Sequence, residues 1–191
     1  MSNEHDHGAE VNEHRSHDHE DNHEGHQHGH EVPPLDANQH REQAVALFNG
    51  VWEMLDAPDR TPAQDDQMVH AAHASRWHWS QAGDLGGEQQ LAVGEWQCAR
   101  VYSVLGRGEP ALHHARACLA LCEASGLGDW VVAAAYEALA RASAVAGDTS
   151  EALAWLARGH TATAAIADPE DRDVIHSDLA SVAAMPILAG A

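Results

Sequence analysis

Histidine side chains with metal-binding potential are concentrated at the start of the chain. The first 34 residues contain nine histidines, interleaved with nine Asp or Glu residues. Neutral imidazole is a good ligand for Zn(II), Ni(II) and Cu(II), and close spacing lets one ion take two or three ligands from a flexible segment. The repeated His-x-His pattern predicts a tail that binds these metals through His5, His7, His17, His19, His26, His28 and His30.

The same tail has a plainer interpretation as a solubilising acidic extension. Its low complexity predicts disorder over residues 1–34, because such a segment cannot bury enough apolar surface to offset its ordering entropy. Its histidines would then gain charge between roughly pH 7.5 and 5.5 without any metal role. If it does bind metal, the lack of a preformed geometry makes it unselective, which suits buffering, storage or delivery better than catalysis.

A second set of candidate ligands lies within a predicted helix. At 100° per residue, Asp66, His70 and His73 share one helical face, where a carboxylate and two imidazoles could supply three ligands to a metal ion. The competing interpretation is ordinary packing of a half-buried helix with a hydrogen bond to each histidine. A fourth ligand would come from a facing helix, with Glu95, His113 and His114 as the available residues.

Two further residue pairs on predicted helices are candidates for a functional role. Cys118 and Cys122 lie one turn apart and could hold Cu(I) or form a redox pair, although cysteine in stacked helices is more often a small apolar filler. Trp77 and Trp79 point to different sides of their helix. At least one of these tryptophans is therefore expected to be exposed and to mark a groove surface.

Composition excludes several functional classes. All ten basic residues are Arg, and the absence of Lys excludes a phosphate-loop lysine and a Schiff base with pyridoxal phosphate. No nucleotide, pyridoxal phosphate or haem signature is present, and a formal charge of -20 disfavours nucleic acid as a partner. No apolar run is long enough to span a membrane, and no signal peptide is recognisable, so we expect a cytoplasmic protein.

Apolar periodicity and capping residues predict an all-α fold with about seven helices. Scarce aromatic and β-branched residues agree with this class. Thr61-Pro62 and Asp168-Pro169 each combine a capping residue with proline at the first helical position, which marks a helix start. The expected helices span about 36–55, 61–81, 88–105, 109–125, 129–146, 150–167 and 169–184.

A pattern of twelve residues occurs twice in the part of the chain that is predicted to be helical. Residues 100–111 and 141–152 each contain a helical run, a Gly turn and a second helix entered before a buried Ala. The pattern resembles the tetratricopeptide repeat over residues 88–167, with 41 residues between Gly106 and Gly147 rather than the usual 34. The motif's apolar and small positions match Cys98, Ala99, Tyr102 and Ala111 in one copy and Tyr136, Leu139, Ala140, Ala152 and Leu156 in the other.

The resemblance implies an array of antiparallel helix pairs over residues 35–185, ending in a capping helix, with residues 186–191 as a short tail. Our leading functional hypothesis is a non-enzymatic interaction module that binds a protein or peptide in its concave groove and divalent metals on its N-terminal tail. One alternative is a metal-dependent enzyme or ligand sensor that uses Asp66, His70 and His73. The other is a structural adaptor with no metal role.

Overall fold

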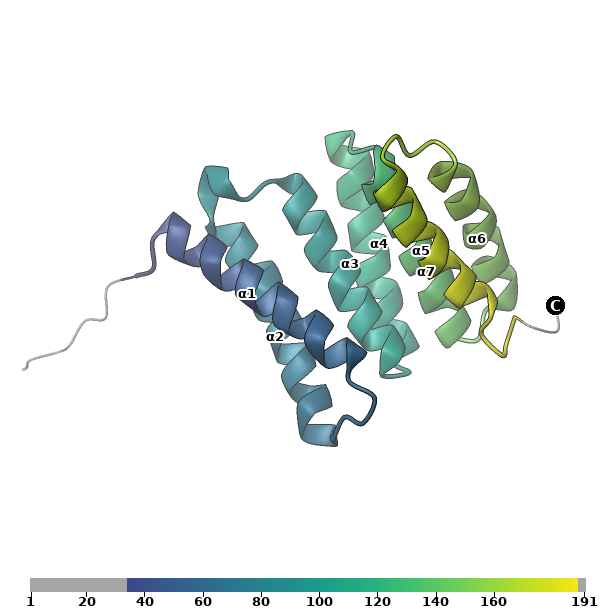
Figure 1. Cartoon of the computed structure of the whole chain (residues 1–191), viewed down its shortest axis with the longest axis horizontal. Helices are drawn as coiled ribbons and strands as arrows, with labels where there is room; N and C mark the ends of the chain where they lie inside the picture. Colours follow the sequence, from purple (N-terminus) through teal and green to yellow (C-terminus); the bar gives the residue numbers. More distant parts are fainter. Residues whose placement is uncertain (1–33, 189–191) are drawn as a thin grey trace, which may run out of the picture. The chain divides into compact units, whose positions relative to one another are not determined.

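The computed structural model describes residues 34–188, and within this part the chain is all α-helical. Seven α-helices and one short 3-10 helix follow one another without any strand among the described residues (Figure 1). The predicted fold class is therefore confirmed. The α-helices are α1 (Ala37–Asp56), α2 (Pro62–Gln81), α3 (Glu88–Val104), α4 (Gly108–Ser125), α5 (Asp129–Val145), α6 (Thr149–Thr163) and α7 (Pro169–Ala183), and the 3-10 helix spans Gly83–Leu85.

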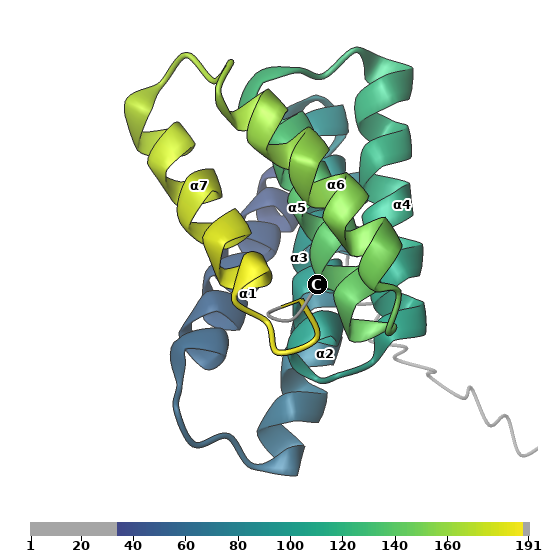
Figure 2. The same ribbon diagram turned by 90° about the vertical axis from the view of Figure 1, so that its right-hand side faces the viewer.

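The helices pack as successive pairs, which is compatible with a helical-repeat architecture. α1, α3, α5 and α7 contact one another in that order, while α2, α4 and α6 each pack against the two helices that flank them in sequence. α1 and α7 lie on one side of this unit and α4 lies on the opposite side (Figure 2). α1 and α7 therefore form two ridges, with α3 and α5 between them.

Local capping interactions explain where the helices begin. The side chains of Asp36 and Thr61 each accept a hydrogen bond from the backbone N–H three residues ahead, and the glutamine side chain at that position accepts one from the backbone N–H of the capping residue. Asp168 caps α7 through the N–H groups of Glu170 and Asp171. The helix starts predicted from Thr61-Pro62 and Asp168-Pro169 are thus confirmed, because these signals depend only on neighbouring residues.

The two repeated turns have the same backbone geometry. Gly106 and Gly147 both adopt positive φ values, 70° and 89°. In each turn the residue after the glycine donates its N–H to a carbonyl five residues back, from Arg107 to Tyr102 and from Asp148 to Ser143, both at 2.9 Å. Glycine is suited to this left-handed conformation because it has no Cβ to clash.

The end of the sixth helix differs from the prediction. We expected helix to about Ala167, but α6 ends at Thr163. The following segment turns inward, so that Ile166 is buried and the N–H of Ala167 donates to Asp129 Oδ1 at 3.2 Å. A tertiary contact with the start of α5 therefore ends a helix that local propensity would continue.

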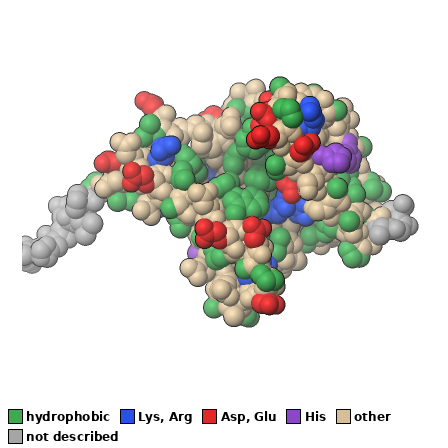
Figure 3. All heavy atoms as spheres, viewed as in Figure 1, with side chains coloured by type: hydrophobic (Ala, Val, Ile, Leu, Met, Phe, Trp, Pro, Cys, Tyr) green, Lys and Arg blue, Asp and Glu red, His purple; other side chains and the backbone are tan. Residues whose placement is uncertain are grey.

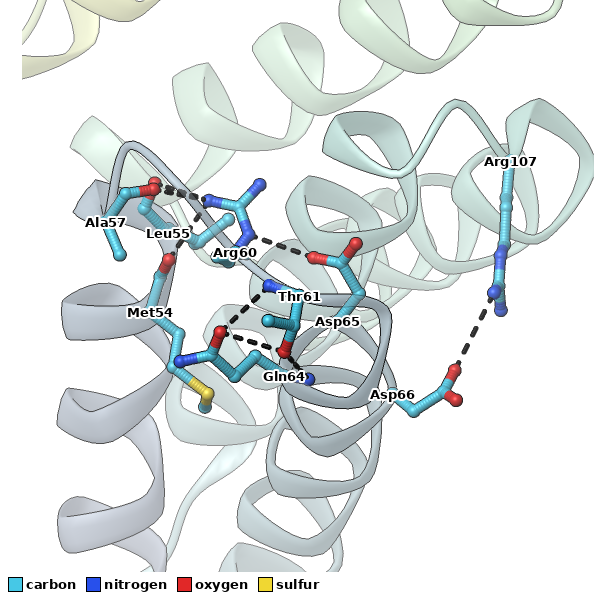
Figure 4. A network of polar contacts seen from close by, with 9 residues as sticks. All are labelled: Met54, Leu55, Ala57, Arg60, Thr61, Gln64, Asp65, Asp66 and Arg107. Atoms are coloured by element: carbon cyan, nitrogen blue, oxygen red, sulfur yellow. Dashed lines mark hydrogen bonds and ion pairs between the residues drawn. The ribbon is translucent and has the colours of Figure 1, made fainter.

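Arg60 connects the end of α1 to the start of α2 (Figure 4). Its guanidinium donates to the carbonyl oxygens of Met54, Leu55 and Ala57 at 3.0–3.2 Å, and to Asp65 at 2.9 Å. Carbonyl groups in the last turn of a helix lack helical partners, and a cation is favoured there by the helix dipole. The Arg60 side chain thus provides hydrogen-bond donors for carbonyl groups at the end of α1 and stabilises the turn between α1 and α2.

Candidate functional site

The predicted tail ligands lie outside the described residues. His5, His7, His17, His19, His26, His28 and His30 all precede residue 34, where the described part of the chain begins. Their role in metal binding and the predicted disorder of the tail therefore stay predictions. The candidate ligands on α2 are described and can be placed.

The structure does not bring Asp66, His70 and His73 together as a ligand set. Asp66 is exposed and points toward Arg107, 3.9 Å away, at the turn between α3 and α4 (Figure 4). It precedes His73 by seven residues, or about 10 Å along the helix axis, which is too far for one ion. Over residues 34–188, no group of three or more His, Cys, Asp or Glu side chains could hold a metal ion.

His73 instead belongs to a polar cluster that α2, α3 and α4 build together. Its Nε2 is 2.9 Å from the hydroxyl of Tyr102, and the Tyr102 ring stacks on the imidazole of His114. His114 Nδ1 is 2.6 Å from Glu95 Oε2, and Arg76 donates to the other oxygen of Glu95 at 2.9 Å. Both carboxylate oxygens of Glu95 are therefore engaged.

Burial and neighbouring charges shift the pKa values of His73 and Glu95 in this cluster. Burial lowers the pKa of His73, and the nearby His114 lowers it further. Burial acts to raise the pKa of Glu95, but the hydrogen bond from His114 and the charge of Arg76 outweigh it, so that the pKa is lowered. A carboxylate whose pKa is lowered and whose two oxygens both accept hydrogen bonds is a weak base.

The cysteines are packed into the core. Cys98, Cys118 and Cys122 are all buried. Burial raises the pKa of Cys98 to about 12, and the pKa of Cys118 is raised by its contact with Cys122 together with burial. The thiols of Cys98 and Cys118 are therefore poor nucleophiles at neutral pH, whereas the hydrogen bond with Cys118 lowers the pKa of Cys122. Their positions fit the interpretation of small apolar fillers.

The face of the described domain shown in Figure 3 has a groove between α1 and α7. Apolar side chains gather between these two ridges, with arginine side chains beside them (Figure 3). At one end a pocket of about 190 Å³ opens, and the helices α1, α2, α3 and α5 all contribute to it. The pocket is lined by Phe48, Trp79, Gln89, Gln90, Val93 and Trp130.

Aromatic side chains continue from this pocket along the floor of the groove. The ring centres of Trp52 on α1 and Trp96 on α3 are 5.3 Å apart, and the ring of Phe48 packs edge to face against that of Trp52. Of the tryptophan pair on α2, Trp77 is 53% exposed, whereas Trp79 lines the pocket. The prediction that one of this pair is exposed is confirmed, and it is the other member that reaches the groove.

A buried glutamate organises the floor of the groove. Glu137 on α5 is fully buried and accepts hydrogen bonds from Trp96 Nε1 at 3.2 Å, Arg100 at 3.2 Å and Arg141 at 2.7 Å. Arg100 also forms an ion pair with Asp178 on α7, at 2.8 Å. This network therefore joins α3, α5 and α7, and Arg141 strengthens it by donating to the backbone carbonyl of Asp178 and to the hydroxyl of Ser181 on α7.

The same network fixes the aromatic side chains. The guanidinium carbon of Arg100 lies 5.7 Å from the ring centre of Trp96 and 5.9 Å from that of Trp52, within the range of cation–π contacts. Burial acts to lower the pKa of Arg100, but Glu137 and Asp178 raise it above its ordinary value. A permanent cation is thus held under two indole rings.

This network was not predicted from the sequence. One signal was present: Glu137 and Arg141 stand four residues apart in an otherwise alanine-rich helix, a spacing at which side chains of opposite charge meet. The partners on α3 and α7 lie about 40 residues away in sequence, and no local pattern connects them.

The groove combines apolar rings, amide side chains and a charge network in which each arginine is paired with a carboxylate. No helix within residues 34–188 is long and apolar enough to cross a membrane. Comparisons with protein-family models, with curated proteins and with solved structures found no match for this chain.

Proposed function

We propose that this protein is a tetratricopeptide-like interaction module that binds a peptide segment of a partner protein in the groove between α1 and α7. The observation that carries the proposal is the aromatic pocket lined by Phe48, Trp79, Val93 and Trp130 at the end of that groove. The N-terminal tail, in the same proposal, binds divalent transition metals for buffering or delivery.

The size of the pocket favours a peptide side chain over a small-molecule cofactor. Its volume of about 190 Å³ falls below the roughly 300–1,000 Å³ typical of small-molecule sites. A single bulky apolar side chain would bury against the indole and phenyl rings. The amide of Gln89 at the rim can donate to and accept from the peptide backbone.

The charge of the chain and of the groove indicates which charge the bound peptide should carry. The chain carries a formal charge of -20, and the arginines at the groove floor are already paired with Glu137 and Asp178. An acidic segment would be repelled and would find no unpaired cation in this network. The expected ligand is therefore a neutral or basic peptide with a large aliphatic or aromatic anchor.

The groove is tested by filling the pocket without removing core atoms. Gln89 is exposed and lines the pocket, so Gln89→Trp places an indole in it. Gln67, exposed on α2 and absent from the pocket lining, provides the matched control Gln67→Trp. Peptides selected from a random library on the native chain should bind Gln89→Trp at least tenfold more weakly and Gln67→Trp equally well, measured by fluorescence anisotropy. Equal binding to both variants, or no enriched peptide, would refute the groove.

The metal role of the tail needs a separate experiment. A variant with His5, His7, His17, His19, His26, His28 and His30 replaced by alanine retains the chain length and the described domain. Equilibrium dialysis against Ni(II), followed by elemental analysis, should show that most bound metal is lost in this variant while its helicity is unchanged. Unchanged metal content would leave the module as an adaptor without a metal role in its tail.

A further inference from the structure

Two histidines outside the groove and outside the predicted ligand sets lie in direct contact. His40 is in the first turn of α1 and His78 is in the last turn of α2, 38 residues apart in sequence. Their Nδ1 atoms are 2.8 Å apart, and both rings are only half-buried. The antiparallel packing of α1 on α2 therefore places two imidazole nitrogens next to each other at an accessible edge.

We propose that His40 and His78 form a two-histidine site for a divalent transition metal, in which the Nδ1 atom of each ring is a ligand and solvent completes the coordination. This inference does not depend on the proposed peptide groove or on the tail. Because only two protein ligands are involved, it also agrees with the absence of any group of three or more ligating side chains within residues 34–188.

The distance between the two nitrogens indicates which metals fit. With metal–nitrogen bonds of about 2.0–2.1 Å, two cis ligands at 90° are about 2.9 Å apart, and two tetrahedral ligands are about 3.3 Å apart. The observed separation of 2.8 Å matches the first value, so the helices need not move. Square-planar and octahedral geometries are those of Cu(II) and Ni(II), whereas Zn(II) favours a tetrahedron.

The hydrogen bond that now joins the two rings is compatible with metal binding. One ring must donate from Nδ1 and the other must accept, so that at least one of the two imidazoles is neutral. Replacing the shared proton with a metal requires each nitrogen lone pair to swing by about 45°, which ring rotation can provide. Burial and the neighbouring His40 lower the pKa of His78, which favours the neutral, metal-binding form.

Trp77 supplies a local reporter for this site. Its ring centre is 5.4 Å from that of His40 and 4.9 Å from that of His78, and the side chain is mostly exposed. Ni(II) and Cu(II) quench tryptophan emission at short range. Emission that depends on Trp77 therefore distinguishes metal at the pair from metal bound elsewhere on the chain.

The experiment uses the full-length chain, with every tail histidine retained. Thermal unfolding is followed with and without Ni(II) in the native protein, in His40→Ala and in the control His160→Ala, which removes an exposed imidazole from α6. At a Ni(II) concentration about 100-fold above the Kd, the native midpoint should rise by about 5–10 °C, because the metal bridges two helices only in the folded state. The shift should persist in His160→Ala and vanish in His40→Ala.

Several outcomes would overturn the proposal. These are an equal shift in His40→Ala, the absence of a shift in the native chain, and a larger shift with Zn(II) than with Ni(II). If His40→Ala does not fold, His78→Ala replaces it in the same comparison. As a second readout, Ni(II) should reduce the emission that is lost in Trp77→Phe, and it should not do so when His40 is absent.

Discussion

Removal of the charge on Glu137 should destabilise this domain more than most single substitutions do, because it leaves buried arginines without their partner. Glu137→Gln keeps the size of the side chain but removes a negative charge that faces both Arg100 and Arg141. The new amide N–H₂ must also point either at the Trp96 N–H or at the arginines, and all of these groups are donors. At least one hydrogen bond is therefore replaced by a clash of donors.

The expected cost follows from the burial of these groups. Glu137 is fully buried, and the side chains of Arg100 and Arg141 are each only 12% exposed. Removing one partner of a buried ion pair costs about 3–5 kcal/mol, which is a large part of the roughly 5–15 kcal/mol that stabilises a typical domain. For a domain of this size the melting temperature should fall by roughly 6–20 °C.

Urea unfolding followed by circular dichroism measures this cost. Glu123→Gln, which removes an exposed acid from α4, is the matched control and should change stability by less than about 0.5 kcal/mol. In a double-mutant cycle with Arg141→Gln, the second substitution should cost less once Glu137 is gone. A loss below about 1 kcal/mol for Glu137→Gln would refute the reasoning that buried charge pairing holds α3, α5 and α7 together.

Two further predictions concern packing and pH. A Cβ added at Gly108 would lie 2.7 Å from Cα of Ala146, so Gly108→Ala should lose about 1–3 kcal/mol in urea unfolding, whereas Gly128→Ala, with open space around it, should show no such loss. The lowered pKa values of His73 and His78 mean that the unfolded chain binds more protons as the pH falls below about 6.5. Stability should therefore decrease between pH 7.5 and 5.5, and His73→Gln should reduce that decrease; an unchanged pH profile in His73→Gln would contradict this assignment.

The ends of the helices could be predicted from the sequence where neighbouring residues determine them. Thr61-Pro62 and Asp168-Pro169 fixed two helix starts, and Gly106 and Gly147 fixed two turns. The end of α6 was wrongly predicted, because the contact that ends it joins Ala167 to Asp129, 38 residues earlier. Local propensity carries no information about such a partner.

The contacts of the candidate site residues could also be predicted only in part from the sequence. Angular position correctly placed Asp66 and His73 on one face of α2, but their separation along the axis and the presence of Arg107 decided what each contacts. The His40–His78 contact depends on the register of α1 against α2. Register between helices is set by packing over their whole length, so residue spacing within one helix cannot reveal it.

The packing of α7 has a consequence for how the domain opens. Within residues 34–188, α7 packs chiefly on α5 and α6, and a helix with neighbours on one side can detach by itself. Its attachment to α3 relies on the Arg100–Asp178 ion pair, and its departure would expose the buried side chains of Ile175, Leu179 and Val182. Amide protons of α7 should therefore exchange with solvent sooner than those of α5. If the proposed peptide binds between α1 and α7, it should slow that exchange, and ligand binding would then be coupled to the opening of the C-terminal half through one helix.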